Sequence, residues 1–163
     1  MNAPISTPMV DCSNPSRRHV AACFRGIVLI ALFPFSALAC SVSATGASFG
    51  TFDPLENVAV VTTGMVTVTC SPSASYTIEL SAGHGGTYSP RKMTGPGGRT
   101  LDYNLFRDAS RTTVWGDGVG GTSRVGGSDD GSGSSHTLYG RIPAGQNPYV
   151  GSYSDSIQVT VVF

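Results

Sequence analysis

Charged residues are scarce in this sequence, and lysine is almost absent. Only 12% of the 163 residues are charged, and the 10 basic residues balance the 10 acidic ones. Lys92 is the one lysine. Nucleic-acid-binding proteins carry a basic stripe or patch, and no such cluster is visible here. The composition, with 21 glycines, favours a secreted β protein over a cytosolic helical one and excludes a nucleic-acid partner.

Helical periodicity is absent as well. Apolar and polar residues alternate in short runs that Gly, Pro, Ser and Asp separate, which is typical of β-strands joined by turns. Strands are expected at 41–52, 58–70, 76–81, 91–94, 101–107, 112–115, 136–142 and 156–163. This pattern predicts an all-β, immunoglobulin-like β-sandwich, with Trp115 and Phe106 in its core.

The last predicted strand has the clearest alternation. Its apolar face consists of Ile157, Val159, Val161 and Phe163. We expect this face to point into the core, while Gln158, Thr160 and Val162 point away. No turn or tail follows Phe163 in the sequence, so the edge of this strand is suited to pairing with a strand from another molecule.

The apolar run at 26–39 is too short to span a membrane comfortably. Arg17, Arg18 and Arg25 precede it, and it ends in Ala37-Leu38-Ala39. Such a pattern predicts a secretory signal peptide over residues 1–39, with a mature domain at 40–163 and no stable membrane span. A buried or interfacial helix is the alternative. Cys40 also raises the possibility of a lipoprotein, but Ala37 stands where a lipobox usually has Leu, so ordinary cleavage is preferred.

Few cysteines are present, and two of the four leave with the predicted signal peptide. Cys40 and Cys70 remain, in an oxidising compartment, and we expect them to form a disulfide worth about 3–4 kcal/mol in the chain-entropy model. Two free buried thiols or a metal pair are the alternatives. The cysteines have no CxxC spacing, which makes a zinc site a poor fit.

Catalytic motifs are missing. His84 and His136 are the two histidines of the predicted mature chain. The sequence has no HExxH, no nucleophile elbow and no phosphate-binding glycine loop. We therefore expect no enzyme, no catalytic or metal-binding residue and no cofactor. The Gly- and Ser-rich stretch 116–135 is expected to be a flexible surface loop. Calcium binding is its alternative, because Gly126 to Asp129 is loosely similar to Gly/Asp-rich calcium repeats.

An ordered series of short motifs resembles the spore coat protein U domain family. The motifs lie at 40–54, 65–70, 76–81, 91–93, 101–106, 110–116, 139–143 and 151–155. Best understood in this family are subunits of archaic (Csu-type) chaperone–usher pili of Gram-negative bacteria. The resemblance implies an incomplete immunoglobulin-like sandwich that lacks its last strand. A periplasmic chaperone fills the gap first, and the N-terminal extension of a neighbouring pilin subunit then replaces it.

The sequence therefore favours an exported structural subunit of such a fibre, with a periplasmic chaperone, an outer-membrane usher and neighbouring pilin subunits as partners. It would travel through the periplasm to the cell surface or fimbrium. The predicted cleavage leaves nothing ahead of Cys40 to donate, which suggests a terminal or minor subunit. The alternative is a self-contained secreted module that binds carbohydrate or another surface ligand.

The expected disulfide is tested by alkylating the exported protein without reductant and measuring its mass. We expect no labelled thiol, and two labelled thiols would contradict the pairing. Cys70→Ser should lower the periplasmic yield, because loss of such a bridge costs about 2–5 kcal/mol.

Overall fold

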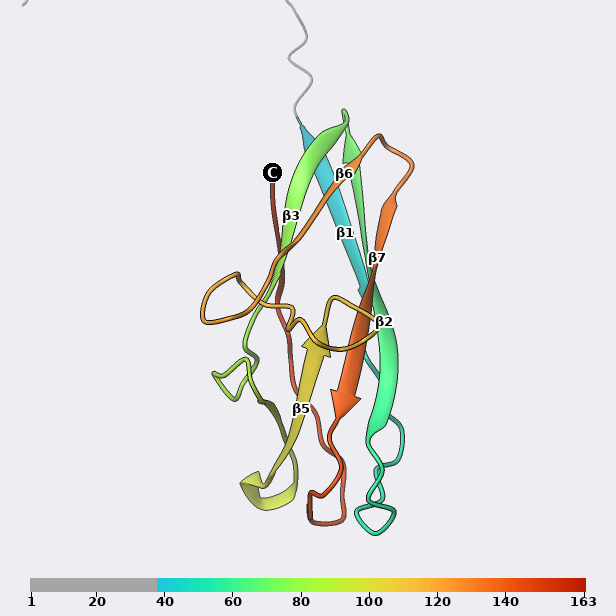
Figure 1. The fold of residues 1–163 in the computed structure, drawn as a ribbon. Coiled ribbons are helices and arrows are strands. Elements are labelled where there is room, and N and C mark those ends of the chain that lie inside the picture. The colour runs from blue at the N-terminus through green and yellow to red at the C-terminus, as the bar shows by residue number, and fades with distance from the viewer. Residues whose placement is uncertain (1–37) are drawn as a thin grey trace, which may run out of the picture. The chain divides into compact units, whose positions relative to one another are not determined.

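The computed structural model describes residues 38–163, which form eight strands and one short 3-10 helix (Figure 1). The strands are β1 (Ala39–Thr45), β2 (Val60–Ser71), β3 (Ala74–Leu80), β4 (Arg91–Thr94), β5 (Thr100–Phe106), β6 (Val125–Asp129), β7 (Ser134–Ile142) and β8 (Val159–Val162). The helix η1 (Pro96–Gly98) lies between β4 and β5. The predicted signal peptide, residues 1–39, lies outside the described residues apart from its last two, so its cleavage stays a prediction.

The strands form two sheets. One has the order β1-β2-β7-β5-β4 and the other the order β6-β3-β8. All pairs of neighbouring strands are antiparallel. The pairing of β8 with β3 places the carboxyl end of the chain beside β3 (Figure 1). The prediction of an all-β sandwich is confirmed.

The core lies between the sheets and follows the alternation of the strands. Its most deeply buried apolar side chains include Trp115, Ile78, Leu80, Ile142, Val66 and Val68. Trp115 is fully buried, and its Nε1 donates a hydrogen bond to the carbonyl of Ile78 at 3.1 Å. Phe106 was expected in the core as well, but it is only half-buried. Leu105 and Tyr103 occupy the inward positions of β5, so the alternation leaves Phe106 on the other face.

The first predicted strand is shorter than expected. The sequence predicts a strand over 41–52, but β1 ends at Thr45. Beyond it, residues 46–54 form no strand pairs. They are still held in place, because Thr62 Oγ1 donates to the carbonyl of Ser48 at 2.7 Å and Phe49 and Phe52 pack against the core. This unpaired but anchored segment forms part of the site described below.

The stretch 116–135 is not one flexible loop, because it contains β6 and the first residues of β7. Its glycines have a packing role: a Cβ on Gly127 would lie 2.8 Å from the Tyr76 hydroxyl. Asp129 is buried and organises the turn into β7. Its carboxylate accepts hydrogen bonds from the amides of Cys70, Gly131 and Gly133 at 2.7–2.9 Å. Backbone amides therefore use the oxygens that the calcium hypothesis needs.

The strand expected at 112–115 is also absent. Two isolated bridges stand in its place, Phe106 with Val114 and Trp115 with Ser123. The buried side chain of Trp115 holds this segment to the sandwich, together with a few backbone hydrogen bonds to β5 and its end, from Arg107 N to Thr113 O at 3.1 Å and from Trp115 N to Leu105 O at 2.9 Å.

Arg91, on β4, is a fully buried cation, and no carboxylate among residues 38–163 lies within salt-bridge distance of it. Its guanidinium donates to the carbonyls of Ser81 and Trp115 and to Oδ1 of Asn104, at 2.7–3.2 Å. It also lies over the ring of Tyr88, 5.0 Å from its centroid. Burial lowers the pKa of Arg91 from its ordinary value. The side chain fastens the end of β3, the start of β4 and the Trp115 segment together.

Arg91→Met should destabilise the fold by about 3 kcal/mol, because it leaves buried carbonyls without donors. Urea unfolding followed by the fluorescence of Trp115, the one tryptophan, measures the effect. Arg141→Met removes an exposed arginine from β7 and should stay within about 0.5 kcal/mol. Equal losses of stability in the two variants would show that the buried hydrogen bonds of Arg91 do not stabilise the fold.

Candidate functional site

A groove opens along one side of the sandwich, where the core is not covered. It has a volume of about 880 Å³. One wall, here called the β1-side wall, is formed by residues 44–54, and the other, the β8-side wall, by residues 148–159. Its floor is the apolar core itself: Val66, Leu80, Met93, Leu101, Leu105, Leu138 and Ile142. The groove therefore gives an outside molecule access to the core.

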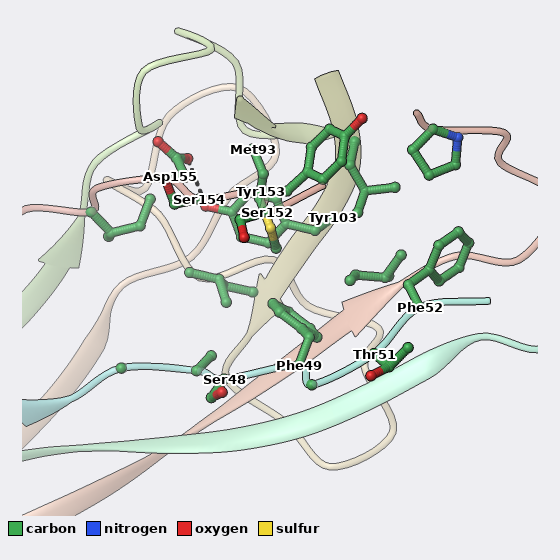
Figure 2. A pocket seen from close by; sticks show the side chains of 18 of the residues that line it. Ser48, Phe49, Thr51, Phe52, Met93, Tyr103, Ser152, Tyr153, Ser154 and Asp155 are labelled. Atoms are coloured by element: carbon green, nitrogen blue, oxygen red, sulfur yellow. Dashed lines mark hydrogen bonds between the residues drawn. The ribbon is translucent and has the colours of Figure 1, made fainter. Parts of the chain in front are cut away.

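Aromatic side chains reach into the groove from its walls and floor (Figure 2). Phe49 and Phe52 come from the β1-side wall, Tyr153 from the β8-side wall and Tyr103 from β5. The rings of Phe49 and Tyr103 meet edge to face, with centroids 5.9 Å apart and planes at 73°. These rings give the groove an apolar lining, and the backbone of the two walls borders it.

Each wall includes or continues into backbone without a strand partner, although Ser154 in the β8-side wall is bridged to Thr94. Among residues 38–163, β8 pairs with β3 alone and is the last strand of its sheet. Opposite it, residues 46–54 have no strand partner within the same range. An unpaired edge beside an apolar cavity is the arrangement that binds an extended peptide: the edge supplies main-chain hydrogen bonds, and the cavity takes alternate side chains.

The structure places two of the four predicted terminal-strand residues at this groove. Ile157 and Val159 line it, and Val161 packs against the core. Val159 and Val161 pair with Leu80 and Ile78 of β3. The strand itself is shorter than 156–163, because the chain has to reach β3 before it can pair.

Phe163 does not fit the prediction. It was expected to point into the core, but it is 61% exposed. It follows Val162, the last paired residue, and lies beyond Val159, the last residue that lines the groove. The predicted alternation holds as far as Val161, but the side chain of Phe163 has little surface to pack against.

Cys40 and Cys70 form a disulfide, with 4.1 Å between their Cα atoms. They are direct partners in the pairing of β1 with β2. The bridge does not line the groove, but it fastens the strand from which the β1-side wall continues. That wall therefore starts from a covalently fixed point.

Sequence reasoning missed the β8-side wall before Ile157. Asp155 is a groove residue whose side chain is only 2% exposed, and Tyr103 donates a hydrogen bond to its Oδ2 at 2.7 Å. Burial, and then this hydrogen bond, raise the pKa of the Tyr103 hydroxyl well above its usual range. The 151–155 motif was the available signal, but alternation by itself does not show what an aspartate contacts.

The described residues offer little for other kinds of site. Residues 38–163 hold no group of three or more His, Cys, Asp or Glu side chains placed to bind a metal ion. In the same part of the chain, no helix has the length and apolarity needed to cross a membrane. The feature with a clear chemical capacity is the apolar groove with its free edge.

Comparison with known proteins gives the family. The model of the Spore Coat Protein U domain matches residues 28–160. The chain belongs to this family. Protein U of Myxococcus xanthus is 31% identical over 130 residues, which cover 71% of this chain and 70% of that protein. The resemblance seen in the sequence is confirmed, and membership of this family supports a structural, non-enzymatic protein.

A solved structure shares the fold. It is the crystal structure of the CsuC–CsuE chaperone–tip adhesion subunit pre-assembly complex from the archaic chaperone–usher Csu pili of Acinetobacter baumannii. The TM-score is 0.58 at 21% identity, over 78% of this chain. The match spans 40% of the length of the other chain, so this chain is similar to one part of it.

The two faces of β8 can be told apart by charge. Val159→Lys should destabilise the protein by about 2 kcal/mol or more, because it places a charge against the core. Thr160→Lys is the matched control, since Thr160 is exposed and lies opposite Glu79. It should change the free energy of unfolding by no more than about 0.5 kcal/mol. Urea midpoints measure both. Equal tolerance would show that the register of β8 is wrong.

Proposed function

We propose that this chain is an exported subunit of an archaic chaperone–usher fibre, and that its groove accepts one β-strand from another protein. The observation that carries the proposal is the groove: an apolar cavity of about 880 Å³ between an unpaired wall and the free edge of β8. Membership of the Spore Coat Protein U domain family and the fold shared with a chain from a chaperone–subunit complex support it.

A donated strand would satisfy both walls at once. Its backbone would pair with β8, and its alternate apolar side chains would enter the groove beside Phe49 and Tyr103. The same strand would give residues 46–54, which follow the end of β1 at Thr45, the partner that they lack. Without it, apolar groove surface and unpaired backbone are open to solvent and to aggregation.

The proposed partners follow from this arrangement. A periplasmic chaperone would fill the groove first, and a neighbouring subunit would replace it at an outer-membrane usher. The disulfide between Cys40 and Cys70 suits an oxidising compartment such as the periplasm. The route would lead to the cell surface or fimbrium.

The place in the fibre would be terminal or minor. If the predicted cleavage follows Ala39, the mature chain begins at Cys40, which is already paired with Cys70 in β1 and β2. No residues then remain ahead of β1 to reach a neighbouring subunit. The subunit would accept a strand without donating one.

Strand acceptance is tested with a synthetic peptide of about ten residues in which Val and Thr alternate, a length typical of one strand. At a concentration of 100 times its dissociation constant the peptide should add about 2.7 kcal/mol of stability and raise Tm by about 10 °C. A peptide of the same composition with its Val residues in one block is the control, because it cannot place alternate side chains in the groove.

Fusing the alternating segment ahead of Cys40 extends the test. The fusion protein should polymerise by strand donation, and size-exclusion chromatography should show a series of oligomers. A stable monomer that responds to neither peptide nor fusion would contradict strand acceptance and favour a self-contained binding module.

A further inference from the structure

The chain changes sheets immediately before β8. Ser154 forms a two-way backbone bridge with Thr94 of β4, at 2.8 and 3.0 Å, in the five-stranded sheet. By Gln158 the backbone is bonded to Ser81, at the end of β3 in the other sheet. Asp155 lies in the crossing between them. The position of the free edge of β8 therefore depends on how this crossing is held.

The carboxylate of Asp155 links the five-stranded sheet to the loop that follows β3 of the other sheet. Tyr103, on β5 of the five-stranded sheet, donates to Oδ2 at 2.7 Å. The amide of His84, in the loop after β3, donates to Oδ1 at 2.8 Å, as does the amide of Ser156. The His84 ring is also near, with Nδ1 3.5 Å from Oδ1, but it is 75% exposed. A buried carboxylate with three donors is a rigid junction, because each lost bond leaves a buried charge less satisfied.

Gly83 shows how closely the loop approaches this junction. Its φ is +75°, and a Cβ there would collide with the carboxylate of Asp155. Only glycine suits this backbone conformation and this approach without strain. On the other side of the junction, Tyr103 touches Phe49 of the β1-side wall. One line of contacts thus crosses the groove from Phe49 through Tyr103 and Asp155 to the loop at His84.

We propose that Asp155 is a positioning residue for strand acceptance: held by Tyr103, it fixes the crossing and so sets where the free edge of β8 lies relative to the β1-side wall. This inference rests on the proposed function. An incoming strand has to pair with β8 and fill the groove at the same time. An edge that is already in place avoids the ordering cost that a loose edge would add to binding.

The test compares two buried tyrosines. Tyr103→Phe removes the hydrogen bond to Asp155, and Tyr76→Phe removes a similar bond between the sheets, from Tyr76 to His136 Nε2 at 2.8 Å. Both tyrosines are buried, at 3% and 4% exposure, but Tyr76 does not line the groove. Both variants should lose similar stability. Only Tyr103→Phe should weaken binding of the alternating Val/Thr peptide, by about tenfold.

Variants at Asp155 separate positioning from charge. Asp155→Ala should lower the affinity for the peptide more than Tyr103→Phe does. Asp155→Asn keeps an oxygen that can accept from the two amides, and its NH₂ group can donate to the Tyr103 oxygen. The peptide affinity of this variant should therefore stay within about threefold of that of the natural protein. If Asp155→Asn binds the peptide as weakly as Asp155→Ala, the charge of Asp155 matters and not its positioning role, and the proposal is overturned.

Hydrogen exchange without peptide gives an independent measure. Amides at 156–162 should exchange faster in Asp155→Ala and Tyr103→Phe than in Tyr76→Phe. If the natural protein does not bind the peptide, the proposed function fails, and this exchange comparison alone decides whether Asp155 positions β8. Equal exchange, or equal peptide affinity in Tyr103→Phe and Tyr76→Phe, would overturn the positioning role.

Discussion

The whole structure depends on an apolar core that its two sheets share but do not close. Trp115, Ile78 and Leu80 are almost fully buried, yet Leu80 also forms part of the groove floor. Sandwiches normally cover such a face with another strand, because apolar surface and unpaired edges invite association. In this chain the gap lies between β8 and residues 46–54, and it is the feature with a clear capacity for function.

Polar side chains hold the parts of the fold that strand pairing leaves loose. Arg91 fastens the Trp115 segment, Asp129 organises the turn into β7, and Asp155 holds the crossing into β8. Each is buried and satisfied mainly by backbone groups or a single hydroxyl. Because a buried charge is costly when a partner is lost, these residues restrict their segments to one conformation. Of the three, Asp155 is the one that lines the groove.

Several features were predictable from local pattern. Alternation in β2, β3, β5, β7 and β8 revealed the strands and the inward residues, since every second side chain meets the same face. The two cysteines that remain after the predicted signal peptide indicated the disulfide. Trp115 was correctly assigned to the core, whereas Phe106 was not, because alternation gives two faces and the register decides which of them is buried.

The sequence by itself determined the all-β class, most strands, the disulfide partners and the inward parity of Ile157, Val159 and Val161. Only the tertiary structure decided that residues 46–54 stay unpaired, that Gly126 and Gly127 lie in a strand against Tyr76, and that Phe163 is exposed. It also decided that Asp155 links β5 to the loop that follows β3. The reason is that pattern reports which side of a strand is apolar, whereas pairing, close approach and burial depend on segments that are distant in sequence.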